Sequence, residues 1–139
     1  MATPPVVPAL YAALRAADVP ALLATLHTDF RGRVTDGLPF GIGGAADGPQ
    51  EMLRDVWARA SAHYDALRPE PDEYSPTADG RVLVLGWYTG TARAGGRPLR
   101  ARFAHVIRVR DGLVAELEQI TDSARWWSAA GATPASAPA

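Results

Sequence analysis

The apolar residues of this chain change their spacing halfway along, and this change limits the folds that the chain can adopt. Between residues 4 and 17 they recur three and four positions apart, as on one face of a helix. Residues 99–110 instead alternate apolar and polar side chains, which is typical of a strand with one buried face. Asp111-Gly112 follows as a two-residue hairpin turn into a last strand over 113–121. Helices followed by hairpin-connected strands predict an α+β fold and not a βαβ fold.

The remaining elements follow from the same patterns. A second helix is expected after Asp18, which is placed to cap it, and a third helix is expected to run to Leu67, with Pro69 ending it. Further strands are expected over 30–35, 81–92 and, more weakly, 70–76, with a glycine-rich loop over 37–48. We expect a single domain over residues 1–127 and a disordered tail of small residues over 128–139.

The charged residues restrict the chemistry that the chain can perform. Its 139 residues have a net charge of -1, and every one of the 14 basic residues is arginine. Without lysine there is no Schiff base, and without cysteine there is no thiol nucleophile, thiolate metal ligand or disulfide. The near-balance of charge argues against nucleic acid or an anionic membrane as a partner. No signal peptide or membrane span is recognisable, so we expect a cytoplasmic protein.

Short motifs for cofactor, metal or covalent chemistry do not have the context that they need. Residues 41–46 match G-x-G-x-x-A before a helix, but no parallel βαβ unit surrounds them. His27 and Asp29 have the spacing of two metal ligands, but the three histidines of the chain lie in different elements. No serine lies in a G-x-S-x-G turn. We therefore expect neither a metal nor a cofactor.

Three polar residues in apolar surroundings remain as candidates for catalysis: His105, Asp122 and Asp36. The alternation of residues 99–110 puts His105 on the apolar face, where an imidazole must find a partner or a use. Each candidate also has a structural interpretation. His105 can be a buried core histidine, Asp122 a helix cap or turn residue, and Asp36 a turn residue. The sequence alone leaves both interpretations open.

Aromatic residues are the candidates for the wall of an apolar binding site. Packing in the helical core is the default interpretation for Tyr11 and Trp57. The full set is Tyr11, Trp57, Tyr64, Trp87, Tyr88 and Phe103.

The order of elements and several segments together resemble the nuclear transport factor 2 superfamily. The segments are LPFGIGG, ADGPQEM, RVLVLGWYTGTA, LRARFAHVIRVRDGLV and EQITD, and the likeness extends over about residues 6–127. Within this superfamily the chain is most similar to the SnoaL-like polyketide cyclases, and less so to the ketosteroid isomerases. The resemblance implies a cone-shaped, curved antiparallel sheet wrapped around three helices from the N-terminal half and enclosing an apolar cavity. It also implies a homodimer formed through the convex face of the sheet.

The resemblance assigns roles to the polar candidates. Asp122 matches the acid/base aspartate at the end of the last strand of the cyclases, His105 their cavity histidine and Tyr11 an early-helix tyrosine. Asp36 lies near the position of the general base of the ketosteroid isomerases. The limonene-epoxide-hydrolase relatives need an Arg two residues before an Asp on the cavity face of the strand that contains His105. Phe103 and His105 stand in those places, so epoxide hydrolysis is disfavoured.

We therefore expect a cofactor-free isomerase or cyclase that acts on a small hydrophobic carbonyl compound, polyketide-like or steroid-like. The alternatives are a small-molecule binding module without catalysis and a dimeric accessory protein of the same fold. For Asp122 to face the cavity, the last strand needs a bulge between Leu117 and Thr121, because strict alternation would also turn Glu116 and Glu118 inward.

Overall fold

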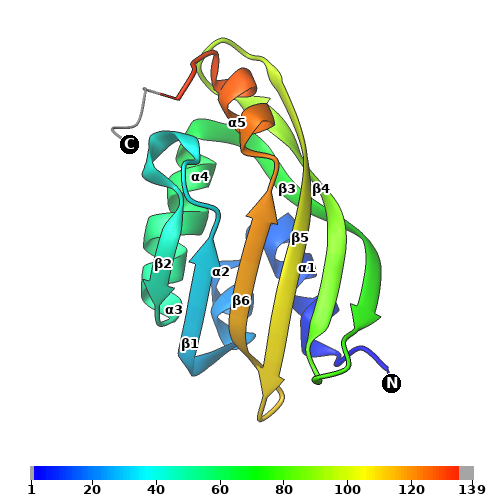
Figure 1. Ribbon diagram of the computed structural model, residues 1–139. Coiled ribbons are helices and arrows are strands. Elements are labelled where there is room, and N and C mark those ends of the chain that lie inside the picture. Colours follow the sequence, from blue (N-terminus) through cyan, green and yellow to red (C-terminus); the bar gives the residue numbers. More distant parts are fainter. Residues whose placement is uncertain (1, 135–139) are drawn as a thin grey trace.

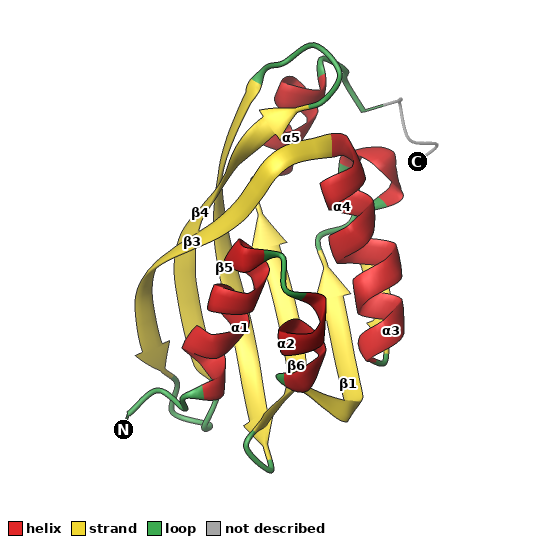
Figure 2. Ribbon diagram, turned by 180° about the vertical axis from the view of Figure 1, so that it is seen from behind, coloured by secondary structure: helices red, strands yellow, loops and turns green. Residues whose placement is uncertain are grey.

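A layer of helices packs against one face of a six-stranded sheet in the computed structural model, which describes residues 2–134 (Figures 1 and 2). The helical elements are α1 (Val6–Ala16), α2 (Val19–Ala24), the 3₁₀ turn η1 (Pro39–Gly41), α3 (Pro49–Glu51), the π-helical segment η2 (Met52–Trp57), α4 (Ala58–His63) and α5 (Ser123–Ala130). The strands are β1 (Leu26–Val34), β2 (Gly44–Asp47), β3 (Tyr64–Pro76), β4 (Val82–Ala92), β5 (Pro98–Arg110) and β6 (Leu113–Thr121). The α+β class is therefore confirmed.

The sheet is mixed and open, with the strand order β2-β1-β6-β5-β4-β3. Its strands pair antiparallel except β1 and β6, which run parallel, so the expectation of a purely antiparallel sheet was wrong at this one pair. The parallel pair arises because β1, the first strand in the chain, lies beside the last one. Figure 2 shows α1, α2 and α3 to α4 in front of the sheet, whereas Figure 1 shows the opposite face without covering helices.

The third helix ends four residues earlier than its apolar periodicity predicts. Helical structure stops at His63, and Tyr64 is extended with φ −130° and ψ 120°. Tyr64 instead begins β3 and pairs with Ala92 of β4, so strand pairing overrides the local helical pattern. β3 is an edge strand, which is where prolines such as Pro69 are tolerated in a sheet.

Glycine is required at two places in the strands that support the interior. At the β5–β6 hairpin, Asp111 and Gly112 both have positive φ, of 54° and 75°, as the expected two-residue turn demands. In β4, Gly86 pairs with Phe103 of β5, and a Cβ atom on Gly86 would lie only 2.6 Å from Cζ of that ring. That atom would also meet the backbone of Glu70 and Pro71 in β3, so the absence of a side chain at Gly86 leaves room for both the Phe103 ring and the neighbouring strand.

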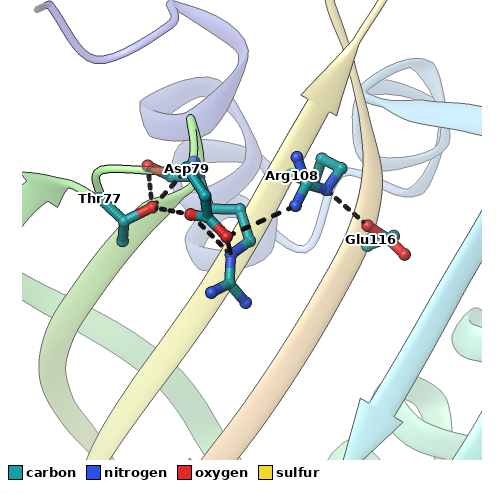
Figure 3. A network of polar contacts seen from close by, with 5 residues as sticks. Thr77, Asp79, Arg108 and Glu116 are labelled. Carbon is teal, nitrogen blue, oxygen red and sulfur yellow. Dashed lines mark hydrogen bonds and ion pairs between the residues drawn. The ribbon is translucent and has the colours of Figure 1, made fainter.

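The core lies between the concave face of the sheet and the helices. β5 alternates as expected, with Phe103, His105 and Ile107 buried on the concave face. On the opposite face Arg102 pairs with Asp72, and Arg108 lies between Asp79 and Glu116 (Figure 3).

The end of the chain differs from expectation. Helix α5 extends through Ala130, with Trp126 and Ala129 buried, so the first residues of the expected tail are helical. Residues 135–139 lie outside the described residues. Between residues 2 and 134, no helix is long and apolar enough to cross a membrane.

Candidate functional site

A small chamber lies between the concave face of the sheet and the helices. Its volume is about 40 Å³, well below the roughly 300–1,000 Å³ of typical ligand pockets. Most of its wall is apolar, and its polar side chains are Tyr88, His105 and Gln119. The apolar part of the wall is formed by Leu14, Ile42, Met52, Val56, Trp57, Ala60, Leu67, Leu117 and Trp126.

His105 is held between two tyrosines. Its Nδ1 lies 2.6 Å from the hydroxyl of Tyr11, and its Nε2 lies 2.7 Å from the hydroxyl of Tyr88. The imidazole also stacks on Phe103, with ring centres 4.1 Å apart. Burial disfavours the charged form and lowers the pKa of His105 to about 3, so the ring is neutral at physiological pH.

Gln119 of β6 donates the next hydrogen bond in this network. The backbone N–H of Thr35 points at its Oε1 from 3.3 Å, and a backbone N–H can only donate. The amide nitrogen of Gln119 is therefore turned the other way, and it donates to the hydroxyl oxygen of Tyr88 over 3.1 Å. Gln119 faces the chamber because it pairs directly with His105 across the β5–β6 ladder.

A proton count shows which hydroxyl remains free to donate. The hydroxyls of Tyr11 and Tyr88 and the one N–H of neutral His105 supply three protons, but only two hydrogen bonds join these groups. The third proton therefore belongs to Tyr11 or to Tyr88. Tyr11 has no exposed surface, and it is not among the described residues that line the chamber.

The free proton is therefore assigned to Tyr88, which lines the chamber. Leaving a buried hydroxyl proton without an acceptor costs about 1–3 kcal/mol, so Tyr11 donates to Nδ1. His105 is then the Nε2–H tautomer and donates to the oxygen of Tyr88. That oxygen accepts two hydrogen bonds, from His105 and Gln119, and its own proton points to the chamber. Burial also raises the pKa of Tyr88 above its usual value, which keeps this donor protonated.

Asp122 is not part of the chamber, which corrects the role expected from the resemblance. Pairing between β5 and β6 is regular from Arg108–Glu116 to Phe103–Thr121. The one register shift in this pair lies closer to the hairpin, between Arg108 and Val109. The expectation of a bulge between Leu117 and Thr121 was therefore wrong, and strict alternation leaves Asp122 exposed. Its carboxylate accepts a hydrogen bond from the backbone N–H of Arg125 and caps α5.

Asp36 and Trp87 also lie outside the chamber. Asp36 is exposed in the turn after β1, in keeping with its structural interpretation. Trp87 lies on the outer face of β4, where the guanidinium of Arg100 stands 3.8 Å from the ring centre and that of Arg102 stands 5.1 Å from it. Trp87 was expected in the cavity wall because residues 81–92 have no strict polar alternation to separate the two faces of the strand.

The other expected aromatic residues are brought together around the chamber in different roles. Tyr88 and Trp57 line it, whereas Phe103 and Tyr11 are buried in contact with the imidazole of His105. Tyr64 is buried as well, and its hydroxyl donates to the backbone oxygen of Trp126 over 3.0 Å.

Gln119 and Trp126 were missed by the sequence analysis. The alternation of the last strand could have identified Gln119 as a polar side chain on the face that also contains Leu117. Trp126 gave no such signal, because its position depends on how α5 folds back: its indole N–H donates to Thr121, 3.1 Å away.

Comparisons with known proteins agree with this architecture. The family model of the SnoaL-like domain matches residues 7–117. An NTF2-like protein of unknown function from Burkholderia pseudomallei K96243 is 31% identical, with 91% of this chain and 95% of that chain covered and a TM-score of 0.81. A comparison with curated protein sequences finds no match.

Two more distant structures share the fold. TerC, co-crystallised with polyporic acid, is 24% identical, with 91% of this chain and 96% of that chain covered and a TM-score of 0.81. IdmH from Streptomyces antibioticus, a proposed polyketide cyclase, is 22% identical, with the same coverage and a TM-score of 0.72. The family match over most of the chain, with the fold described above, shows that this protein belongs to the SnoaL-like domain family of NTF2-like proteins.

Proposed function

We propose that this protein binds a small, largely apolar molecule through an oxygen atom that accepts the hydrogen bond of Tyr88. The observation behind this proposal is the hydrogen-bond geometry around Tyr88, which leaves its hydroxyl proton free in a chamber with a mostly apolar wall. A carbonyl or enolate oxygen is the matching acceptor. The two hydrogen bonds that the Tyr88 oxygen receives polarise its O–H bond and strengthen it as a donor.

Replacing Tyr88 by phenylalanine tests this proposal, because it removes the hydroxyl and keeps the ring. A panel of hydrophobic ketones and lactones would be compared with hydrocarbons of the same shape, with affinity measured by tryptophan fluorescence. Loss of one hydrogen bond of about 1.4 kcal/mol corresponds to a tenfold loss of affinity. We expect Tyr88→Phe to lose this factor for ketones and to bind hydrocarbons unchanged.

Tyr74→Phe is the matched control for this experiment. Tyr74 also contacts the ring of Tyr11, edge-on at 6.1 Å, but it is not among the described residues that line the chamber. Its substitution should leave both ligand classes unaffected. Equal ketone affinity in the wild type and Tyr88→Phe would overturn the proposal.

A second candidate is catalysis: a cofactor-free isomerase or cyclase that acts on a carbonyl compound, polyketide-like or steroid-like. The doubly hydrogen-bonded oxygen of Tyr88 favours it, because such a donor stabilises an enolate as it forms. No carboxylate lines the chamber within residues 2–134, and both nitrogens of His105 are engaged. Suitable substrates would therefore be 1,3-dicarbonyl compounds, which are acidic enough at carbon to lose that proton to water. Turnover of such compounds that is lost in Tyr88→Phe would support catalysis, and binding without turnover would favour the binding module.

We also propose that two copies pair through the uncovered face of the sheet. This face contains Ile120, which is 54% exposed, and the exposed residues Arg31, Arg33 and Glu118. None of these three charged residues has an ion-pair partner among the described residues. A twofold interface would cover the isoleucine and bring the one unpaired glutamate of each copy to the two arginines of the other copy.

Sedimentation velocity tests the pairing. The wild type should sediment as a dimer at micromolar concentration, and Ile120→Glu should sediment as a monomer because it places a charge in the apolar part of the interface. A monomeric wild type would contradict the proposal.

A further inference from the structure

A second, larger hollow lies directly outside the chamber. It is a groove of about 560 Å³ between the end of α1, α2, the η2–α4 helix and the start of β3. Leu14, Trp57 and Leu67 belong to both the groove and the chamber, and each is half-buried. These three side chains therefore form the partition between the two spaces. The rest of the groove's apolar wall includes Val19, Leu22 and Leu53.

The charge of the groove is positive. Arg15 at the end of α1 and Arg68 in β3 line it, and neither makes an ion pair within the described part of the chain. Asp65, the one carboxylate among the described residues that line the groove, is bound by Arg93 over 2.8 Å and is thereby neutralised. An apolar groove edged by two unpaired guanidinium groups is complementary to an apolar molecule with an anionic end.

The partition contains an unusual backbone segment. Trp57 is the last residue of the π-helical segment η2, which interrupts the helix between Pro49 and His63. Such segments are rare and occur frequently at functional sites. The backbone irregularity thus coincides with the side chain that stands between the groove and Tyr88.

We infer that the groove and the chamber are two parts of one site, which takes an elongated, apolar carbonyl compound with a carboxylate at its far end. The chamber is large enough for little more than a carbonyl group, so the body of the ligand lies in the groove. Its carboxylate lies against Arg15 and Arg68, and its carbonyl oxygen reaches Tyr88 past Trp57. This inference rests on the proposed function, because it uses the same hydrogen-bond donor.

A series of phenyl keto acids and their methyl esters provides the test. Two to six methylene groups would separate the ketone from the carboxyl group, because the experiment also determines which length spans the distance from Tyr88 to the two arginines. Binding is measured by displacement of the neutral dye N-phenyl-1-naphthylamine. At the best length we expect the acid to bind at least tenfold more tightly than its ester, and added salt should reduce this ratio.

Substitutions separate the two ends of the ligand. The double variant Arg15→Gln, Arg68→Gln should bring the acid down to the affinity of the ester. The control Arg97→Gln, Arg100→Gln removes two exposed arginines that make no ion pair within the described residues and do not line the groove, and it should keep the ratio. Tyr88→Phe should weaken acid and ester by the same factor.

The outcomes distinguish this inference from the proposed function. If acid and ester bind equally well to the wild type, or if the double variant keeps the preference for the acid, the inference is overturned. In that case weaker binding by Tyr88→Phe would leave the proposed function intact. If neither compound binds at any length, both are overturned.

Discussion

Acid should destabilise this protein through His105 in particular. The imidazole has a pKa of about 3 in the fold and about 6.5 in the unfolded chain. Between these values the unfolded state takes up a proton that the folded state does not, so stability falls as the pH falls. Each pH unit in this interval changes the free energy of unfolding by about 1.36 kcal/mol. The interval of about 3.5 units therefore corresponds to a loss of about 5 kcal/mol of stability. Above pH 7 both states are neutral at this residue, and the effect vanishes.

The measurement is urea unfolding of the wild type and His105→Gln, followed by circular dichroism between pH 7.5 and 4. Glutamine keeps a donor and an acceptor but does not titrate, and the carboxylates common to both proteins cancel in the difference between them. The wild type should be the more stable protein at pH 7, and its advantage should shrink by about 1.4 kcal/mol per unit below pH 6. A difference that stays constant with pH would refute the burial of a neutral imidazole. His105→Phe, which also does not titrate, should show the same shrinking difference.

Three further substitutions test the placement of residues around the site. Asp122→Ala should lower the free energy of unfolding by about 1 kcal/mol through loss of the α5 cap, with ligand affinity unchanged in the fluorescence assay. Gly86→Ala should lower the stability by about 1–3 kcal/mol in urea unfolding, because its Cβ would meet the backbone oxygen of Glu70 in β3 and the ring of Phe103; a neutral result would show that both β3 and the ring have room to move. Trp87→Phe should leave ligand binding as it is, because the indole lies on the outer face of β4, and a weakened affinity would contradict that position.

Periodicity predicts the parts of this fold in which one face of an element is buried. The alternation of residues 99–110 correctly placed His105 and Phe103 inside, and Asp111-Gly112 marked the hairpin. Periodicity failed where pairing with a distant strand decides the backbone. The apolar stripe that continues to Leu67 looks helical, but from Tyr64 onward the backbone pairs with β4.

The candidate site, like the fold, was predicted only where the face of a strand decides the position of a side chain. A strand pattern reports which face a residue occupies, and this was enough for His105. The role of Asp122 depended on the register of β6. A single bulge changes the face of every later residue in a strand, and the bulge in this pair of strands does not lie where it was expected. The network through Gln119 depends on contacts between residues 84 positions apart, which no local pattern contains.

Nitrogen-15 NMR of the imidazole of His105 tests the proton arrangement around Tyr88 most directly. The assignment, made by comparison with His105→Gln, distinguishes this ring from those of His27 and His63. At pH 7 the Nδ1 should resonate as an unprotonated nitrogen and Nε2 as a protonated one, and neither signal should change down to pH 5. A protonated Nδ1 would mean that Tyr88 donates to His105, and the hydroxyl would then have no proton to offer a ligand.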